Sequence, residues 1–387
     1  MLLSRIQILK FLSLSVLCTG CIVPFNPNSS EETGNQLVVD GDIIANGTTV
    51  VRLSRSLKLS SEMSESMERY ARIDVESSSG VFYPARETSP GIYEAATYEL
   101  DLSALYRLNI TTRSGKTYAS EFVPVSVSSN IDSLYYEVDM NNRNVNIYMS
   151  SSSNSAHSTH YHRWECDQDW EFTSSYKADI TFNPTLMRYT QFPVGYDIYT
   201  CYGNETSSTI MLANTSDLSS GVIANEKILT IPAGDRRLSG LYCVQVNLRG
   251  LSQEAFRFWN VLLKNNTQLG GIFAPQPSEQ RGNITCLSQP DEVVIGFINA
   301  TTITLSKRLF IERPFPVKPL CSEDDLISVD VNDLSSAMEL SSGHYLPLYG
   351  TVEGESRPRD VIVWAPAGCV DCTTRGTKNR PSWWPND

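Results

Sequence analysis

Short runs of alternating apolar and polar residues fill the first third of the chain. Residues 36–43 and 48–57 carry β-branched side chains on either side of Asn46-Gly47, a pair typical of hairpin turns. Similar runs follow, and Ser-Gly pairs separate some of them. Strands this short at this spacing are typical of two packed antiparallel sheets. The pattern therefore predicts an immunoglobulin-like β-sandwich over residues 37–127.

The strand pattern continues into the rest of the chain. Residues 131–139, 144–151 and 238–251 are strand-like in the same way, and residues 160–180 form an aromatic-rich run of the same kind. We therefore expect residues 128–387 to form a larger, mostly-β domain, which makes the fold class of the whole chain mainly β.

One amphipathic helix interrupts the strands, over residues 252–266. Ser252 is of a type that caps helix N-termini, and apolar side chains then recur at helical spacing. These side chains belong to Ala255, Phe256, Trp259, Leu262 and Leu263. A second, weaker helical stretch is predicted near residues 331–340, with Asp333 as its cap.

The start of the chain has the pattern of a bacterial lipoprotein signal peptide. Arg5 and Lys10 precede an apolar run at residues 11–17, which is too short to span a bilayer as a permanent helix. Small residues then precede a cysteine. We predict a signal peptide over residues 1–20, cleavage before Cys21 and lipidation of the Cys21 thiol.

The residues that follow the predicted cleavage site suit a tether. Residues 21–36 are rich in Pro, Asn and Ser and show no periodicity, which is typical of a linker. No later segment is apolar for long enough to cross a membrane. The sequence therefore predicts attachment to a membrane through the N-terminal lipid.

Charge and composition exclude some classes of function. The chain has 31 basic and 43 acidic residues, a net charge of −12, and no basic stripe that would attract a nucleic acid. Hydrophobic residues make up 41% of the sequence, which is enough for packed cores and excludes a mostly disordered chain. We expect no nucleic-acid partner.

The sharpest local motif is Cys369-Val-Asp-Cys372 in the C-terminal tail. A redox pair, a zinc site completed by Cys321 and Cys286, and a structural disulfide are all readings of this spacing. We favour disulfides, in which the two cysteines join each other or other cysteines. Seven cysteines follow Cys21, so at least one stays unpaired.

The histidines are the natural catalytic or metal-binding candidates, but their pattern is weak. His157, His160 and His162 cluster, and Asp167 or Asp169 could complete a site with them. No HExxH framework, GxSxG elbow, EF-hand loop or phosphate-binding glycine loop supports such chemistry. We therefore predict no catalytic residue, metal or cofactor.

The tail ends in a pair of tryptophans, Trp383 and Trp384, after a proline. Exposed aromatic rings can serve as a platform for a sugar ring or a peptide, so these two are candidate binding residues. The alternative is a latch that packs the tail onto the body of the protein.

Several motifs together resemble the DUF4249 family of Bacteroidota lipoproteins. The specific ones begin with LSQEAFRFW, GNI and GFINA and end with CVDCTTRGTKNRPSWWP. The resemblance implies an envelope lipoprotein of the outer membrane, encoded beside TonB-dependent transporters, whose N-terminal sandwich is of the carboxypeptidase-regulatory type. It carries over no catalytic residue. The first acidic residues, Glu31 and Glu32, lie ten places after the lipid site, so the side of the membrane stays open.

A resemblance to proteins of this phylum also singles out Asp132-Ser133-Leu134, which fits a short O-glycosylation pattern with Ser133 as acceptor. For function, the leading hypothesis is a non-enzymatic accessory of a TonB-dependent nutrient transporter, which binds an oligosaccharide or peptide ligand or the transporter itself. A structural, assembly or adhesion lipoprotein and a glycan or peptide hydrolase are the alternatives.

Overall fold

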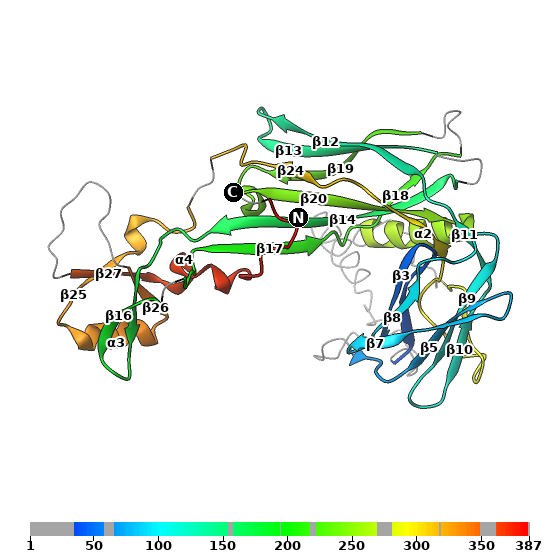
Figure 1. Ribbon diagram of the computed structural model, residues 1–387, viewed down its shortest axis with the longest axis horizontal. Helices are drawn as coiled ribbons and strands as arrows, with labels where there is room; N and C mark the ends of the chain where they lie inside the picture. Colours follow the sequence, from blue (N-terminus) through cyan, green and yellow to red (C-terminus); the bar gives the residue numbers. More distant parts are fainter. Residues whose placement is uncertain are drawn as a thin grey trace, which may run out of the picture.

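The computed structural model describes residues 35–57, 66–153, 158–193, 195–216, 222–268, 281–316, 319–348 and 361–385. The fold is mainly β, with 50% of the described residues in strands and 12% in helices. Figure 1 shows three parts in a row, here called the N-terminal sandwich, the central sandwich and the C-terminal module. Among the described residues, no helix has the length and apolarity needed to cross a membrane.

The N-terminal sandwich is built from two packed sheets. The first contains β1 (Leu37–Gly41), β3 (Gly47–Arg55), β4 (Ser66–Met67), β7 (Arg86–Ser89) and β8 (Ile92–Thr97). The second contains β2 (Ile43–Ile44), β5 (Arg72–Ser77), β6 (Phe82–Pro84), β9 (Leu105–Thr111), β10 (Thr117–Ser120), β11 (Val123–Ser126), β21 (Ile284–Cys286) and β22 (Ala300–Thr301).

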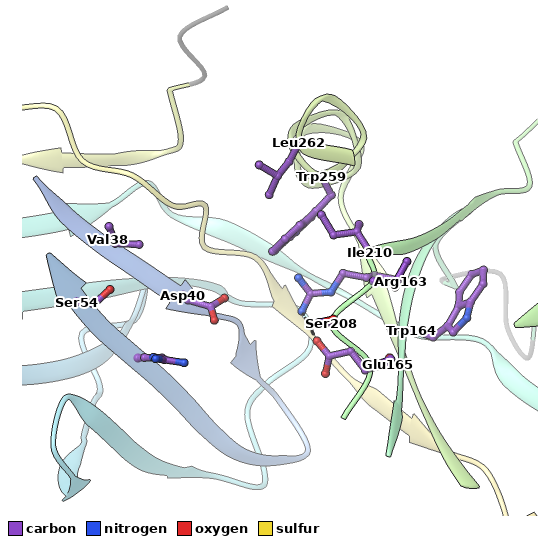
Figure 2. Close-up of a pocket in the computed structure, with 13 residues that line it drawn as sticks. Val38, Asp40, Ser54, Arg163, Trp164, Glu165, Ser208, Ile210, Trp259 and Leu262 are labelled. Atoms are coloured by element: carbon purple, nitrogen blue, oxygen red, sulfur yellow. Dashed lines mark hydrogen bonds and ion pairs between the residues drawn. The ribbon is translucent and has the colours of Figure 1, made fainter. Parts of the chain in front are cut away.

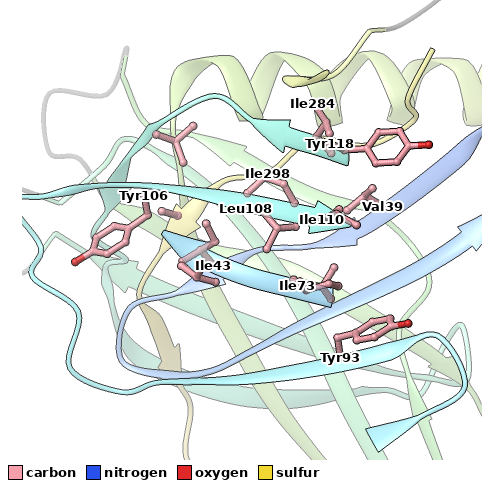
Figure 3. Packing of buried hydrophobic residues seen from close by; sticks show 14 of the residues in the cluster. Val39, Ile43, Ile73, Tyr93, Tyr106, Leu108, Ile110, Tyr118, Ile284 and Ile298 are labelled. Carbon is pink, nitrogen blue, oxygen red and sulfur yellow. The ribbon is translucent and has the colours of Figure 1, made fainter. Parts of the chain in front are cut away.

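The alternation in the sequence determines which side chains fill this sandwich. Every second residue of β5 and β9 is buried, so Ile73, Leu108 and Ile110 point into the space between the sheets (Figure 3). Tyr93 of β8 faces them from the other sheet, and its hydroxyl donates a 2.9 Å hydrogen bond to the carbonyl of Glu68. The core is therefore apolar, and the buried phenol has a partner.

Two strands of the second sheet come from far along the chain. β21 pairs with β10, and β22 lies between β2 and β11 and runs parallel to both. Ile284, Ile298 and Ala300 complete the core (Figure 3 labels the first two). The sandwich predicted from the sequence spans residues 37–127, whereas the folded sandwich also takes in residues 283–301.

Close backbone contacts allow this late segment to enter the sandwich. Gly282 lies against the carbonyl of Gly296, and Gly296 in turn lies against the carbonyl of Val39 with a φ of +136°. A β-carbon at either glycine would collide with backbone atoms. Both positions therefore require glycine for steric reasons.

The central sandwich packs a three-stranded sheet against a six-stranded sheet. The first contains β12 (Asn130–Asp139), β13 (Asn144–Ser152) and β19 (Ile223–Pro232). The second contains β14 (Tyr161–Thr173), β17 (Thr200–Thr206), β18 (Met211–Asn214), β20 (Tyr242–Leu251), β23 (Ile303–Leu305) and β24 (Leu309–Ile311). The short 3₁₀ helix η2 (Arg236–Leu238) precedes β20.

Strand β14 is the centre of the larger sheet. β20 pairs along one edge of it, while β18 and β17 share the other edge. Its even-numbered residues Trp164, Cys166 and Trp170 enter the core between the two sheets. Arg163 and Glu165 therefore lie on the opposite face of the strand.

Helix α2 (Gln253–Gln268) follows β20 directly, close to the predicted range of 252–266. Ser252 caps it as expected, because its hydroxyl accepts a 3.1 Å hydrogen bond from the amide of Ala255. The ring of Phe256 packs 5.0 Å from the ring of Tyr161 in β14, measured between centroids. This contact holds the helix across the end of the larger sheet.

The C-terminal module is small and mixed. It contains β15 (Ile180–Asn183), β16 (Arg188–Gln191), η3 (Glu323–Asp325), β25 (Ile327–Asp330), α3 (Leu334–Ser342), β26 (Tyr345–Leu348), β27 (Val361–Pro366), α4 (Ala367–Val370) and η4 (Cys372–Thr374). Trp364 is fully buried against Phe182 and Tyr189. Asp333 caps α3 by accepting a 3.1 Å hydrogen bond from the amide of Ser336. Apart from residues 283–301, which join the N-terminal sandwich, the region 128–387 thus folds as two parts, which strand patterns alone do not separate.

Candidate functional site

A cleft of about 470 Å³ lies where the N-terminal sandwich meets the central sandwich. Figure 2 shows β1 and β3 on one side, β14 on the other and α2 above. The lining residues labelled there are Val38, Asp40, Ser54, Arg163, Trp164, Glu165, Ser208, Ile210, Trp259 and Leu262. We call this space the interdomain cleft.

Four charged side chains form a closed ring beside the cleft. Asp42 accepts hydrogen bonds from Arg163 at 3.1 Å and from Arg249 at 3.0 Å. Glu165 accepts from the same two arginines at 3.2 Å and 2.8 Å. Asp42 belongs to the N-terminal sandwich and the other three belong to the central one. This charge ring (Asp42, Arg163, Glu165 and Arg249) therefore joins the two parts.

Strand geometry explains how the ring forms. Arg163 and Glu165 are two residues apart on β14 and so share a face, and Arg249 of β20 lies directly opposite Arg163. Two arginines opposite each other would repel. The two carboxylates offset that repulsion, and one of them, Asp42, has to come from the neighbouring sandwich.

The ring is largely buried, so the stability of the protein depends on all four charges being present. The side chain of Asp42 is 1% exposed and that of Arg163 is 7% exposed. Burial disfavours the charged form of Arg249, yet the carboxylates of Asp42 and Glu165 outweigh burial and hold its pKa above the ordinary value. A buried charge of this kind is tolerated only while its partners remain.

Aromatic and polar groups complete the wall of the cleft. The guanidinium of Arg163 lies 4.2 Å from the centroid of the Trp259 ring, a cation–π contact. The Nε of Arg163 and the indole N–H of Trp259 are buried and have no hydrogen-bond partner among the described residues. The wall therefore keeps hydrogen-bonding capacity that the protein itself does not use.

The lining charges balance and suit binding more than acid–base chemistry. Two arginines, Arg52 and Arg163, and two carboxylates, Asp40 and Glu165, line the cleft. Each carboxylate oxygen of Glu165 is engaged by an arginine, so this residue is not placed to give a proton to a substrate. A balanced, partly aromatic lining fits a neutral or zwitterionic polar ligand.

The histidines do not assemble with the acids named from the sequence. His162 is 1% exposed and its Nε2 lies 3.4 Å from the hydroxyl of Ser129. Burial, with a smaller effect from His160, lowers its pKa to about 4. Asp167 and Asp169 lie on the other face of β14. His157 lies outside the described residues.

No group of three or more His, Cys, Asp or Glu side chains that could hold a metal ion occurs among the described residues.

Both cysteines of the tail motif form disulfides with distant partners. Cys372 bonds to Cys201 of β17, and Cys369 bonds to Cys321. Cys286, the other residue named for a zinc site, is a free thiol buried in the N-terminal sandwich. The two disulfides tie the C-terminal module to β17 and to itself.

The tail tryptophans pack against the central sandwich. Trp384 is 5% exposed, and its ring centroid lies 5.8 Å from that of Tyr202 and 6.0 Å from that of Phe310. Trp383 is partly exposed beside Arg308, whose guanidinium lies 4.0 Å from its ring centroid. These contacts tie the tail to β17 and β24.

Two other predicted modification sites differ in where they lie. Ser133 is exposed on strand β12, where an acceptor hydroxyl is accessible. Cys21, the signal peptide at residues 1–20 and nearly all of the tether lie outside the described residues.

The charge ring is not among the sites predicted from the sequence. The alternation Arg163-x-Glu165 on a strand was a visible sign that the two side chains share a face. Asp42 could not be added to them, because it is 121 residues away from Arg163 in sequence.

Comparison with known proteins identifies one family. The family model described as "Domain of unknown function (DUF4249)" matches residues 22–307, so the C-terminal tail lies beyond the match. A search of curated proteins finds no match. Among solved structures, "Structure of Yersinia pseudotuberculosis adhesin InvE" matches with 12% identity and a TM-score of 0.15, over 57% of this chain and 56% of that chain. A TM-score this low carries no argument about fold or function.

Proposed function

Because this chain belongs to the DUF4249 family, we propose that it is a non-enzymatic accessory lipoprotein that binds its ligand in the interdomain cleft. Lipid on Cys21 anchors it at the outer membrane, beside a TonB-dependent nutrient transporter. The bound partner is an oligosaccharide, a peptide or the transporter itself.

The observation that carries the proposal is the fixed geometry of the cleft. Its walls come from two separately packed sandwiches, and the charge ring joins them. Two hydrogen bonds from asparagine side chains also connect the two sandwiches. Asn299 donates to the carbonyl of Gly250 at 3.0 Å, and Asn46 donates to the carbonyl of Ile303 at 3.0 Å. A preorganised cleft binds without the cost of ordering its walls.

Two features support the proposed location. The N-terminal pattern that ends at Cys21 is that of an exported, lipidated protein. The disulfides Cys201–Cys372 and Cys321–Cys369 fit an oxidising compartment, since such bonds are rare in reducing ones.

Ligand binding is tested by filling the cleft. Ser208 is an exposed residue in its lining, outside the charge ring. Ser208→Trp is expected to abolish recovery of a transporter from solubilised membranes and any thermal shift with oligosaccharides or peptides. Ser114→Trp, at an exposed turn between β9 and β10, is the matched control. Equal recovery and equal shifts by both variants would place binding elsewhere.

The anchor is tested separately. Cys21→Ser is expected to move the mature protein from the membrane fraction to the soluble fraction of the envelope, with the thermal shift of the cleft unchanged. If the variant stays in the membrane pellet, another attachment operates and the lipid anchor is wrong.

A structural or adhesive role is the second candidate. Its support is the row of three β-rich parts in Figure 1, an extended arrangement that suits a spacer. A chain that keeps both sandwiches but lacks the C-terminal module would distinguish the two roles. It should retain ligand binding in the cleft under the first proposal. It should lose the spacer or adhesive function under the second.

A further inference from the structure

A second cavity lies at the other end of β14, on the side of the C-terminal module. It has a volume of about 310 Å³ and is lined by the end of β14, by η2, by the segment around Arg313 and by the residue that follows η4. This volume lies within the range of small-molecule sites. We call it the arginine pocket.

Its lining carries three positive charges and no carboxylate. Arg236, Arg313 and Arg375 line it, and no Asp or Glu does. None of the three arginines forms an ion pair with a carboxylate in the described part of the chain. The protein as a whole has a net charge of −12, so acidic residues are plentiful elsewhere. Asp235, which pairs with Arg237, offsets part of the charge of Arg236 but does not line the pocket. A lining of three arginines without a carboxylate suits an anion that comes from outside.

The deepest arginine has unused donors. The Nε and Nη2 atoms of Arg375 are buried and make no hydrogen bond with any described residue. The hydroxyl of Ser174, in a residue that is 3% exposed, lines the same pocket and likewise has no partner in the described part of the chain. Burial lowers the pKa of Arg375, and the neighbouring charge of Arg236 lowers it further. Leaving these groups unpaired costs free energy that a bound oxyanion would recover.

The covalent structure holds these groups in place. Arg375 follows directly after η4, which the Cys201–Cys372 disulfide fixes to β17. The guanidinium of Arg375 lies 5.5 Å from the ring centroid of Phe172. Ser174 is positioned by a backbone hydrogen bond of 2.9 Å to the carbonyl of Tyr199. The donors therefore do not need to be ordered when a ligand arrives.

We propose that the arginine pocket binds a small molecule that carries a phosphate or sulfate ester. The planar guanidinium fork matches the oxygens of such groups, and several cations suit a strongly charged oxyanion better than a single carboxylate. Arg236 and Arg313 are exposed at the rim, where they meet the anion as it enters. Phe172 and Leu320 supply apolar contact for the body of the ligand.

Calorimetry on the full mature protein, solubilised in detergent in a chloride buffer, tests this. The probes are glucose 6-phosphate, glucose 6-sulfate, glucose, inorganic phosphate and inorganic sulfate. We expect one or both esters to bind and glucose not to bind; the tighter ester identifies the preferred oxyanion. Arg375→Ala and Arg313→Ala should each weaken ester binding about tenfold or more.

Controls separate binding from folding and from general charge. Arg86→Ala removes an exposed arginine of the N-terminal sandwich and should leave ester affinity unchanged. Arg313 is exposed, so its variant folds even if Arg375→Ala does not. The proposal is overturned if no ester binds, if glucose or the inorganic ions bind as tightly as the esters, or if Arg313→Ala binds as well as wild type. None of these outcomes bears on the interdomain cleft.

Discussion

Two groups of arginines lie at opposite ends of β14. Near Tyr161, Arg163 and Arg249 meet two carboxylates and close the charge ring. Near Thr173, no carboxylate lines the arginine pocket, and its arginines form no ion pair with the described residues. The same strand therefore contributes to a neutralised joint at one end and to an unneutralised cavity at the other.

The difference teaches how the surroundings decide what an arginine does. In the charge ring, each guanidinium has its partners inside the protein, so removing a partner leaves a buried charge. In the arginine pocket, the buried donors of Arg375 have no hydrogen-bond partner among the described residues. The ligand-free protein therefore already bears the free-energy cost of burying them unpaired. Stability and ligand binding should therefore respond in opposite ways to substitutions at the two ends.

The largest expected effect is at Asp42. Asp42→Ala leaves Arg163 and Arg249 buried with one carboxylate between them, so the free energy of unfolding should fall by about 3 to 5 kcal/mol. Urea denaturation measures this loss. Arg72→Ala, which removes an ion pair between Asp74 and a side chain that is 80% exposed, is the control and should cost at most about 1 kcal/mol. Equal losses of unfolding free energy in the two variants would mean that the charge ring does not hold the two sandwiches together.

The next effect depends on pH and comes from His162, whose side chain lies on the opposite face of β14 from that of Arg163. Its folded-state pKa of about 4 lies below the 6.5 of the unfolded chain, so protons favour unfolding. Its contribution to stability is complete above pH 6.5 and is lost as the pH falls from 6.5 to 4, by about 3 kcal/mol.

Urea denaturation of wild type and His162→Gln at several values between pH 7 and pH 4 checks this. The variant should lack that part of the acid-induced loss. His344→Gln, at an exposed position, should lose stability with falling pH as wild type does. Arginines stay charged throughout this range, so neither arginine group contributes to the difference. Parallel curves for wild type and His162→Gln would contradict the assignment.

Local signals in the sequence predicted local structure well. The alternation in β5 and β9, the cap at Ser252 and the cap at Asp333 each depend on neighbouring residues, and the structure has strands and helices there. The mainly-β fold class is confirmed for the same reason. These features need no knowledge of distant partners.

Contacts between residues far apart in the chain could not be predicted from the sequence. The strands β21 and β22 enter the N-terminal sandwich from more than 150 residues away from β10 and β11. Cys201 and Cys372 are 171 residues apart. A single sequence does not indicate which distant residues pair, because any other cysteine or any other β-branched run would be an equally suitable partner. The charge ring and the arginine pocket both depend on such distant contacts.

The smallest expected effect is a gain, and it bears most directly on the comparison. In phosphate-free and sulfate-free buffer, Arg375→Met removes an unpaired cation but keeps apolar contact with Phe172, so the free energy of unfolding should rise by about 0.5 to 1 kcal/mol. Arg163→Met should lower it, because Asp42 then loses a partner. Stability changes of the same sign in both variants would mean that the two ends of β14 use arginine alike.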